Sequence, residues 1–415
     1  MTQTATLKRS TLLYAFTILC TGGVNFLAIP VLKHKIGAPE YAYLNLYMNL
    51  LLVSSFIGSG WLSQGCIRFF PVLSLQQNFA QVFGKLSVLS AITTGLLSVL
   101  LILFFPHYRW MLFAFPLAVV LVNIQMAAIS WMQATLQPHI YAGAEIGRAL
   151  FYLVVILWLR PVANISMPAL LWMGWILSYV LSFTCMIIFM RKNSSEIIST
   201  ENAATTAGVF KKLFGFGFPM SLWLAASFSI FYADRFLLLW HLPASLVGNY
   251  SALFDVLQKG MGFLLAPVVT AVTPLLSRLY EAGAFSEYKK LVSKILKWQV
   301  IISLVSIAGF IIGWPLLQKM LHMENTGNIF FYAGLFVITG AALWQIVFIL
   351  NKPFEMRHQT KMLVVTMAAC LVFQLTADYF LVPAYGFTGA AVTFFLAIAL
   401  YAIFIIFRSK KWRSQ

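Results

Sequence analysis

Twelve stretches of this chain are apolar over about twenty residues or more. A helix needs about 20 such residues to cross a hydrocarbon core roughly 30 Å thick. The stretches cover residues 10–32, 43–65, 82–106, 110–132, 139–160, 167–190, 212–233, 246–271, 297–318, 329–350, 361–382 and 386–407. The sequence shows no period-2 alternation in ten-residue segments, which would mark a membrane β-barrel. It therefore predicts an all-α protein of about 12 transmembrane helices.

The composition agrees with a membrane protein. Hydrophobic residues make up 61% of the 415 residues and charged residues 9%, against roughly 25% charged residues in a soluble domain. A chain of this length cannot bury so much apolar surface in one water-soluble core. The four Cys and six His residues show no pair at metal-ligand spacing, so we expect no metal site.

The net charge of +17 follows the membrane topology and does not indicate a nucleic-acid partner. If both termini are cytoplasmic, most of the 28 Lys and Arg residues fall in cytoplasmic segments. The exceptions on the other side are Lys33, Lys35, Arg109, Arg160, Arg235 and Lys319. This distribution obeys the positive-inside rule. We expect cytoplasmic termini and basic loops that contact anionic lipid headgroups.

A polar segment, "RKNSSEIISTENAATTAGVFKK" (191–212), separates the apolar stretches into two groups of six. We expect an N-terminal lobe at 1–190, a cytoplasmic linker at 191–211, a C-terminal lobe at 212–407 and a basic tail at 408–415. The segments "IPVLKHKIGAPEYAYLN" (29–45) and "ADRFLLLWHLPASLVGN" (233–249) are weakly alike, so that Asn45 corresponds to Asn249. Because six is an even number, two six-helix repeats would enter the membrane in the same orientation. Such parallel repeats usually enclose a cavity at their interface.

The segment "SALFDVLQKGMGFLLAPVV" (251–269) carries two charges within an apolar stretch. Asp255 and Lys259 are four residues apart and share one helical face, where they can pair. A charge at mid-bilayer costs about 2.5–3.5 kcal/mol on insertion scales, so both groups should face protein or water. Two interpretations stay open: a self-neutralising pair that joins two helices, or a polar cavity wall where Lys259 binds an anion and Asp255 tunes or titrates it.

A second pair lies in "YAGAEIGRALFYLVV" (141–155). Glu145 and Arg148 are three residues apart and again share one helical face. Arginine keeps its charge in proteins, and its planar fork suits phosphate oxygens. Structural pairing and phosphate binding are equally open for this pair.

Five further charged residues lie near the ends of apolar stretches. Arg68 and Arg278 are near the inner ends of the second and eighth stretches, where side chains often snorkel to lipid phosphate. Asp234 and Arg235 end the seventh stretch and can form an interfacial pair or contact substrate and ions. Asp378 is either a protonatable coupling group or a hydrogen-bonding partner of a neighbouring helix. No P-loop, nucleophile elbow or zincin motif is present, so we expect no catalytic residues and no enzyme.

Motifs in the second half resemble a known family. They are "FGFGFP" (214–219), "DRFLLLWHLPASLVGNYSAL" (234–253), "PLLSRLYEAG" (274–283) and "DYFLVPAYGFTGAAVT" (378–393). Taken in this order they resemble the polysaccharide-transporter branch of the multidrug/oligosaccharidyl-lipid/polysaccharide (MOP) flippase superfamily. The resemblance covers nearly the whole chain, and its motifs are mostly structural and do not identify a cargo.

The resemblance implies two pseudo-symmetric lobes around a central cavity, a MATE-like arrangement, with alternating access. The cargo of that branch is an undecaprenyl-diphosphate-linked oligosaccharide, such as an O-antigen repeat unit, moved across the bacterial inner membrane. By position, Arg68 and Arg278 match recurring arginines of the family. The implied partners are the lipid-linked glycan, membrane lipids and other glycan-assembly proteins. No cofactor is expected, and coupling to H⁺ or Na⁺ through Asp255 or Asp378 stays open.

Two alternatives belong to other functional classes. A cation-coupled multidrug exporter on the same fold should offer unpaired carboxylates to its cargo, whereas Glu145 has Arg148 beside it. A membrane glycosyltransferase or polymerase of the same pathway generally needs a sizeable outer loop. The longest outward loop that we expect spans about ten residues, 33–42, which favours the transporter.

Overall fold

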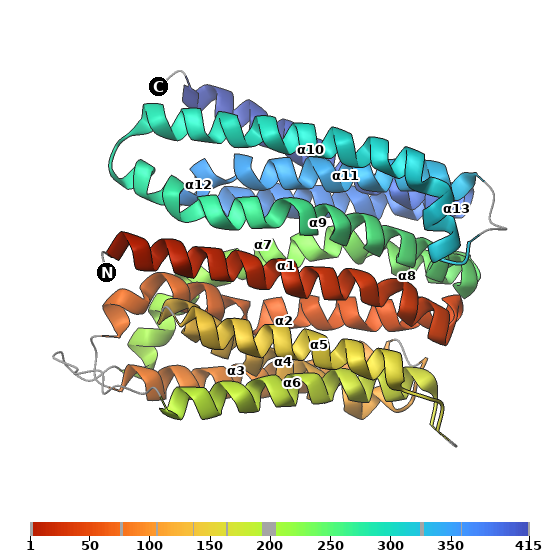
Figure 1. Cartoon of the computed structure of the whole chain (residues 1–415), viewed down its shortest axis with the longest axis horizontal. Coiled ribbons are helices and arrows are strands. Elements are labelled where there is room, and N and C mark those ends of the chain that lie inside the picture. Colours follow the sequence, from red (N-terminus) through yellow and green to blue (C-terminus); the bar gives the residue numbers. More distant parts are fainter. Residues whose placement is uncertain are drawn as a thin grey trace. The chain divides into compact units, whose positions relative to one another are not determined.

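The computed structural model describes residues 3–74, 78–104, 107–135, 137–162, 165–192, 205–323, 328–357 and 359–413. This part of the chain is almost entirely helical (Figure 1). Its helices are α1 (Gln3–Ile36), α2 (Ala38–Leu73), α3 (Phe79–Leu103), α4 (Met111–Ala134), α5 (Pro138–Trp158), α6 (Met167–Lys192), α7 (Thr206–Tyr232), α8 (Asp234–His241), α9 (Ala244–Glu281), α10 (Phe285–Met320), α11 (Ile329–Leu350), α12 (Lys352–Met356) and α13 (Thr360–Arg413). The predicted all-α class is confirmed.

Eleven helical segments of the described chain are long and apolar enough to cross a membrane, judged by length and composition. One of them, α13, holds two of the predicted spans. Its 54 residues would extend about 80 Å if straight, far beyond a hydrocarbon core of roughly 30 Å. Gly386 breaks the helix with φ 59° and ψ −140°, a backbone conformation that only glycine adopts readily.

The chain reverses direction at Gly386. A Cβ atom on Gly389 would lie 2.6 Å from the carbonyl oxygen of Leu381, although these residues would be about 12 Å apart in a straight helix. The two arms of α13 therefore form a helical hairpin. Its turn lies where the sequence places the boundary between the last two spans.

The chain forms two compact units. We call Tyr47–Ser229 the central unit, and Met1–Leu46 together with Ile230–Gln415 the flanking unit. In the flanking unit α1 packs along α9, where the ring of Phe263 lies against Gly22 and Gly23. In the central unit α7 packs on α2, because Gly217 lets the two backbones meet at Trp61.

These units do not coincide with the predicted lobes at 1–190 and 212–407. The first helix packs with helices of the second half, and most of α7 packs with helices of the first half. The six-plus-six division stays a prediction. Residues 193–204 of the predicted linker lie outside the described residues. Residues 206–211 of it are helical, because α7 begins at Thr206.

The prediction of an outward loop at residues 33–42 is wrong. α1 continues to Ile36 and α2 starts at Ala38, so the single residue Gly37 connects them. Gly37 has φ 82°, a left-handed conformation that glycine tolerates without a steric penalty. This tight connection places the first turns of α2 close to α9. A Cβ atom on Gly248 of α9 would collide with the carbonyl group of Ala38.

Each unit has its own apolar core. In the flanking unit Val269, Val292 and Ile349 bring together α9, α10 and α11. In the central unit Leu62, Phe83 and Leu213 do the same for α2, α3 and α7. Asp255 and Lys259 lie on α9, which the core of the flanking unit holds in place.

Candidate functional site

The predicted pair of Asp255 and Lys259 forms on α9. The Lys259 Nζ atom lies 3.1 Å from Asp255 Oδ2. The same oxygen accepts hydrogen bonds from Tyr41 Oη at 2.9 Å and Asn45 Nδ2 at 2.8 Å. Both donors come from the first turns of α2, which Gly37 turns back toward α9. Asp255 is therefore stabilised by two neutral donors besides Lys259.

The two members of this pair differ in exposure. The side chain of Asp255 is 1% exposed, and that of Lys259 is 38% exposed. A buried carboxylate needs hydrogen-bond donors to offset its desolvation, and Tyr41 and Asn45 supply them. The ammonium of Lys259 is the member that can leave the pair and contact another anion.

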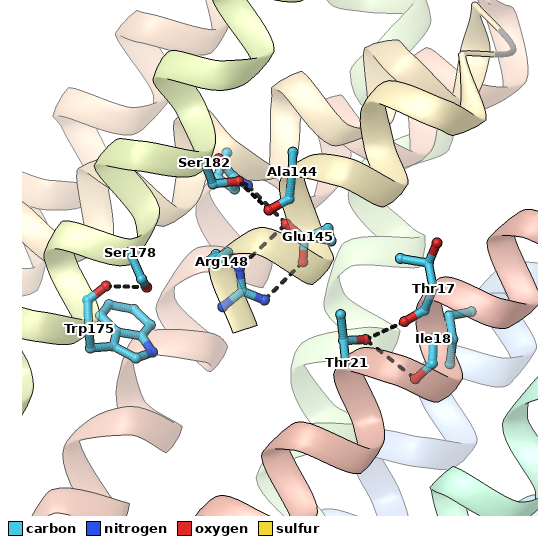
Figure 2. Close-up of polar contacts among 10 residues, drawn as sticks. Thr17, Ile18, Thr21, Ala144, Glu145, Arg148, Trp175, Ser178 and Ser182 are labelled. Carbon is cyan, nitrogen blue, oxygen red and sulfur yellow. Dashed lines mark hydrogen bonds and ion pairs between the residues drawn. The ribbon is translucent and has the colours of Figure 1, made fainter. Parts of the chain in front are cut away.

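The predicted pair of Glu145 and Arg148 forms on α5 in the central unit (Figure 2). Arg148 Nη2 lies 2.8 Å from Glu145 Oε2, and Arg148 Nε lies 3.4 Å from Glu145 Oε1. Gln125 of α4 donates from Nε2 to Glu145 Oε1 at 2.9 Å and to the Ser182 hydroxyl of α6 at 2.8 Å. Ser182 in turn donates to the Ala144 carbonyl at 3.2 Å. This network of hydrogen bonds therefore joins α4, α5 and α6.

Aromatic rings of α6 lie beside Arg148. Its guanidinium carbon is 4.6 Å from the centroid of the Tyr179 ring, a distance that allows a cation–π interaction. The centroids of the Trp175 and Tyr179 rings are 4.3 Å apart. Only 14% of the Arg148 side chain is exposed, so Arg148 is less accessible than Lys259.

The two clusters share one arrangement. In each, a carboxylate lies one helical turn before a cation and also accepts a hydrogen bond from an amide side chain of another helix. That amide is Asn45 in the flanking unit and Gln125 in the central unit. Sequence reasoning found both ion pairs and missed both amides. The available signal was a polar amide within or at the edge of an apolar stretch, which usually faces protein.

Asp234 and Arg235 were expected at the end of the seventh stretch as an interfacial pair or as contacts for substrate. They form an ion pair at the start of α8, but both are fully buried. Tyr250 Oη lies 3.2 Å from Asp234 Oδ2, and Arg235 Nη1 donates to the carbonyl of Phe231 at 2.9 Å. The guanidinium lies 4.1 Å from the ring centroid of Phe254. The structure gives Arg235 a packing role among α7, α8 and α9, and its contact with substrate stays a prediction.

Asp378 lies inside the α13 hairpin and is fully buried. One oxygen accepts a hydrogen bond from Thr393 of the other arm. The other oxygen, Oδ2, has no hydrogen-bond partner within the described residues. Of the two open interpretations, the hydrogen bond to a neighbouring helix is present, and the coupling role stays a prediction.

Arg68 and Arg278 are exposed near helix ends and do not join either cluster. The Arg68 guanidinium lies 4.7 Å from the ring centroid of Phe216 and 5.8 Å from that of Phe69. Arg278 lies in the last turn of α9. Within the described ranges, no three His, Cys, Asp or Glu residues are grouped so that they could hold a metal ion.

Comparisons with solved structures agree with this architecture. No protein-family model matches the chain. A putative O-antigen transporter of Shigella flexneri is 29% identical over 196 residues, which are 47% of this chain and 46% of that protein. The match therefore spans about half the length of this curated relative.

Several solved structures cover almost the whole chain. An inward-facing multidrug resistance MATE family transporter of the MOP superfamily has a TM-score of 0.74 at 11% identity and covers 96% of this chain and 98% of its own. The MATE multidrug transporter DinF-BH has a TM-score of 0.71 at 14% identity, with coverages of 98% and 95%. A MOP superfamily transporter from Pyrococcus furiosus has a TM-score of 0.69 at 11% identity, with coverages of 98% and 96%.

The chain is therefore a multi-pass membrane protein, and its described part is almost entirely helical. Its fold is that of the MOP-superfamily transporters, including those of the MATE family. The resemblance seen in the sequence is confirmed at this level.

Proposed function

We propose that the chain is a flippase that moves an undecaprenyl-diphosphate-linked oligosaccharide, such as an O-antigen repeat unit, across the bacterial inner membrane. It would act by alternating access with both termini in the cytoplasm. The observation that carries this proposal is the partly exposed side chain of Lys259 beside a buried carboxylate that has two other donors. Phosphate oxygens form strong, charge-assisted hydrogen bonds with such a cation.

Arg148 supports the same conclusion from the central unit. Its fork can exchange Glu145 for a phosphate while Gln125 continues to donate to the Glu145 carboxylate. Arginine suits this role because its donors match phosphate geometry. Either cation, Lys259 in the flanking unit or Arg148 in the central unit, can thus stabilise a diphosphate group as it leaves water.

The partial match to a putative O-antigen transporter also supports a glycan cargo. The structural relatives include multidrug transporters, so a drug exporter is the main alternative. A cationic drug would need an accessible carboxylate, but the Asp255 side chain is 1% exposed and that of Glu145 is 11% exposed. In the Pyrococcus furiosus transporter, a binding pocket of reverse polarity suggests a different function. Lys259, whose side chain is 38% exposed, is the more accessible member of its pair and favours an anionic cargo.

Ion coupling is the second part of the proposal. The Oδ2 atom of Asp378 is buried in the α13 hairpin, where it can take up a proton or contribute to a Na⁺ site. Gln374 lies one helical turn earlier and also has a side-chain oxygen, Oε1, without a hydrogen-bond partner within the described residues. An Asp378→Asn variant should still bind cargo but lose any dependence of transport on a proton or Na⁺ gradient.

The function can be tested with the purified chain in liposomes. The probe is a short-chain polyprenyl-diphosphate oligosaccharide with a fluorescent label, and an impermeant quencher reports its movement between leaflets. We expect the wild type to accelerate this movement. Lys259→Met should reduce the wild-type rate at least tenfold, whereas the control variant Lys319→Met should keep it. Transport of a lipophilic cation with no movement of the diphosphate lipid would contradict the proposal in favour of a drug exporter. Extension of the glycan in the presence of sugar nucleotides would instead indicate a transferase.

A further inference from the structure

One face of α10 changes from basic to aliphatic along its length. Lys290, Lys294 and Lys297 follow one another at spacings of four and three residues, which puts them on one helical face. The same spacing continues through the exposed side chains of Ile301 and Leu304. This stripe is therefore cationic from the second to the fourth turn of α10 and apolar afterwards.

The opposite face of α10 holds the helix in the flanking unit. Tyr288, Val292 and Ile295 are buried against α9 and α11. Each lies two residues from one of the three lysines, which is about 200° around the helix. The lysines therefore point away from the protein, and all three are exposed.

The change along the stripe marks the edge of the membrane. From Trp298 to Gln318 the helix carries no charged residue, and this segment has about the length that a bilayer core requires. Lys297 and Lys319 bracket it. Trp298 is 54% exposed, and tryptophan is enriched at the interface between lipid and water.

We propose that Lys290, Lys294 and Lys297 form a binding face for the phosphate groups of anionic phospholipids in the adjoining leaflet. The three side chains cover about 10 Å along the helix axis. They lie next to the exposed apolar side chains of Ile301 and Leu304, which would contact the acyl chains of a lipid. A phospholipid with its tails on these two side chains places its phosphate beside the lysines. Glu287, one turn before Lys290, is also exposed and lowers the positive charge of this face. The proposal does not depend on what the protein transports.

The test compares two variants with equal net charge. The first is the face variant, Lys290→Gln with Lys294→Gln and Lys297→Gln. The second is the scattered variant, Lys85→Gln with Lys319→Gln and Lys361→Gln, which removes three exposed lysines from other places. The purified full-length chain is incorporated into nanodiscs of phosphatidylglycerol and phosphatidylcholine, and the lipids retained after extraction are counted by native mass spectrometry.

The enrichment is the ratio of phosphatidylglycerol to phosphatidylcholine among the retained lipids. We expect it to fall about fivefold at low salt for each lysine removed from the face. In the scattered variant it should change little. Glu287→Gln should raise the enrichment, which no loss of folding can mimic. The single Lys→Gln variants keep the test decisive if the triple variant misfolds. Equal enrichment in the face and scattered variants would overturn the proposal and leave the lysines as an ordinary solvated surface.

Discussion

Lys259 and Asp255 share one face of α9, yet the side chain of Lys259 is 38% exposed and that of Asp255 is 1% exposed. The carboxylate keeps Tyr41 and Asn45 as donors when the ammonium moves away. The pair is thus arranged so that the cation can act outside it.

The first prediction separates cargo binding from charge neutralisation. Lys259→Met should leave the fold intact and reduce transport of the diphosphate lipid by 10- to 100-fold, the equivalent of one lost hydrogen bond to a charged group, about 1.5–3 kcal/mol. The double variant Asp255→Asn with Lys259→Met should stay equally inactive in the liposome assay. If Lys259 serves only to neutralise Asp255, the double variant will recover the wild-type rate.

The second prediction concerns Arg148. The exchange of Glu145→Arg and Arg148→Glu keeps an ion pair on the same face of α5, so the protein should accumulate at the normal level. Transport should be lost, because the cation no longer lies beside Tyr179. Surface glycan and protein level, measured in the same cells, check both points. Full activity of the exchanged variant would show that the pair is purely structural.

Much of the fold could be predicted because a bilayer imposes simple rules. Apolar stretches of sufficient length predicted the spans, and Gly386 lies where the last two spans were expected to separate. The pairing of Glu145 with Arg148 and of Asp255 with Lys259 follows from helical periodicity alone. These features depend on residues close together in the sequence.

Other features depend on contacts between distant segments. The sequence does not reveal that Asn45 reaches Asp255, because this requires the tight turn at Gly37 and the close approach of Gly248 to Ala38. The packing of α1 with helices of the second half was missed for the same reason. A charged residue at the end of a span is usually interfacial, whereas Arg235 is enclosed by aromatic rings of α7 and α9.

The third prediction tests the hairpin of α13. Gly386→Ala places a side chain on a backbone with positive φ, which costs about 1–3 kcal/mol, so the melting temperature of the purified protein should fall. Gly309→Ala is the control, since a Cβ atom there meets nothing within 4 Å and alanine favours a helix. Equal melting temperatures for both variants would mean that the turn at Gly386 is not formed as described.

The fourth prediction tests the contact between α2 and α7. Gly217→Ala should force the two helices apart, because the new Cβ atom would collide with the carbonyl group of Trp61. Overpacking of this kind costs about 1–3 kcal/mol. Gly215→Ala lies two residues earlier on the same helix, where a Cβ atom has open space, and should melt like the wild type. A stable Gly217→Ala protein would show that the helices are further apart than described.

The fifth prediction concerns the buried pair of Asp234 and Arg235. Arg235→Met leaves the Asp234 carboxylate buried with Tyr250 as a donor, and removal of one partner from a buried pair costs about 3–5 kcal/mol. The double variant Asp234→Asn with Arg235→Met should regain most of the lost stability, because no uncompensated charge remains. Thermal melting of the single and double variants measures this difference. If Arg235 also contacts the cargo, the double variant will be stable but inactive in the liposome assay. Recovery of both stability and transport would confine Arg235 to a role in packing.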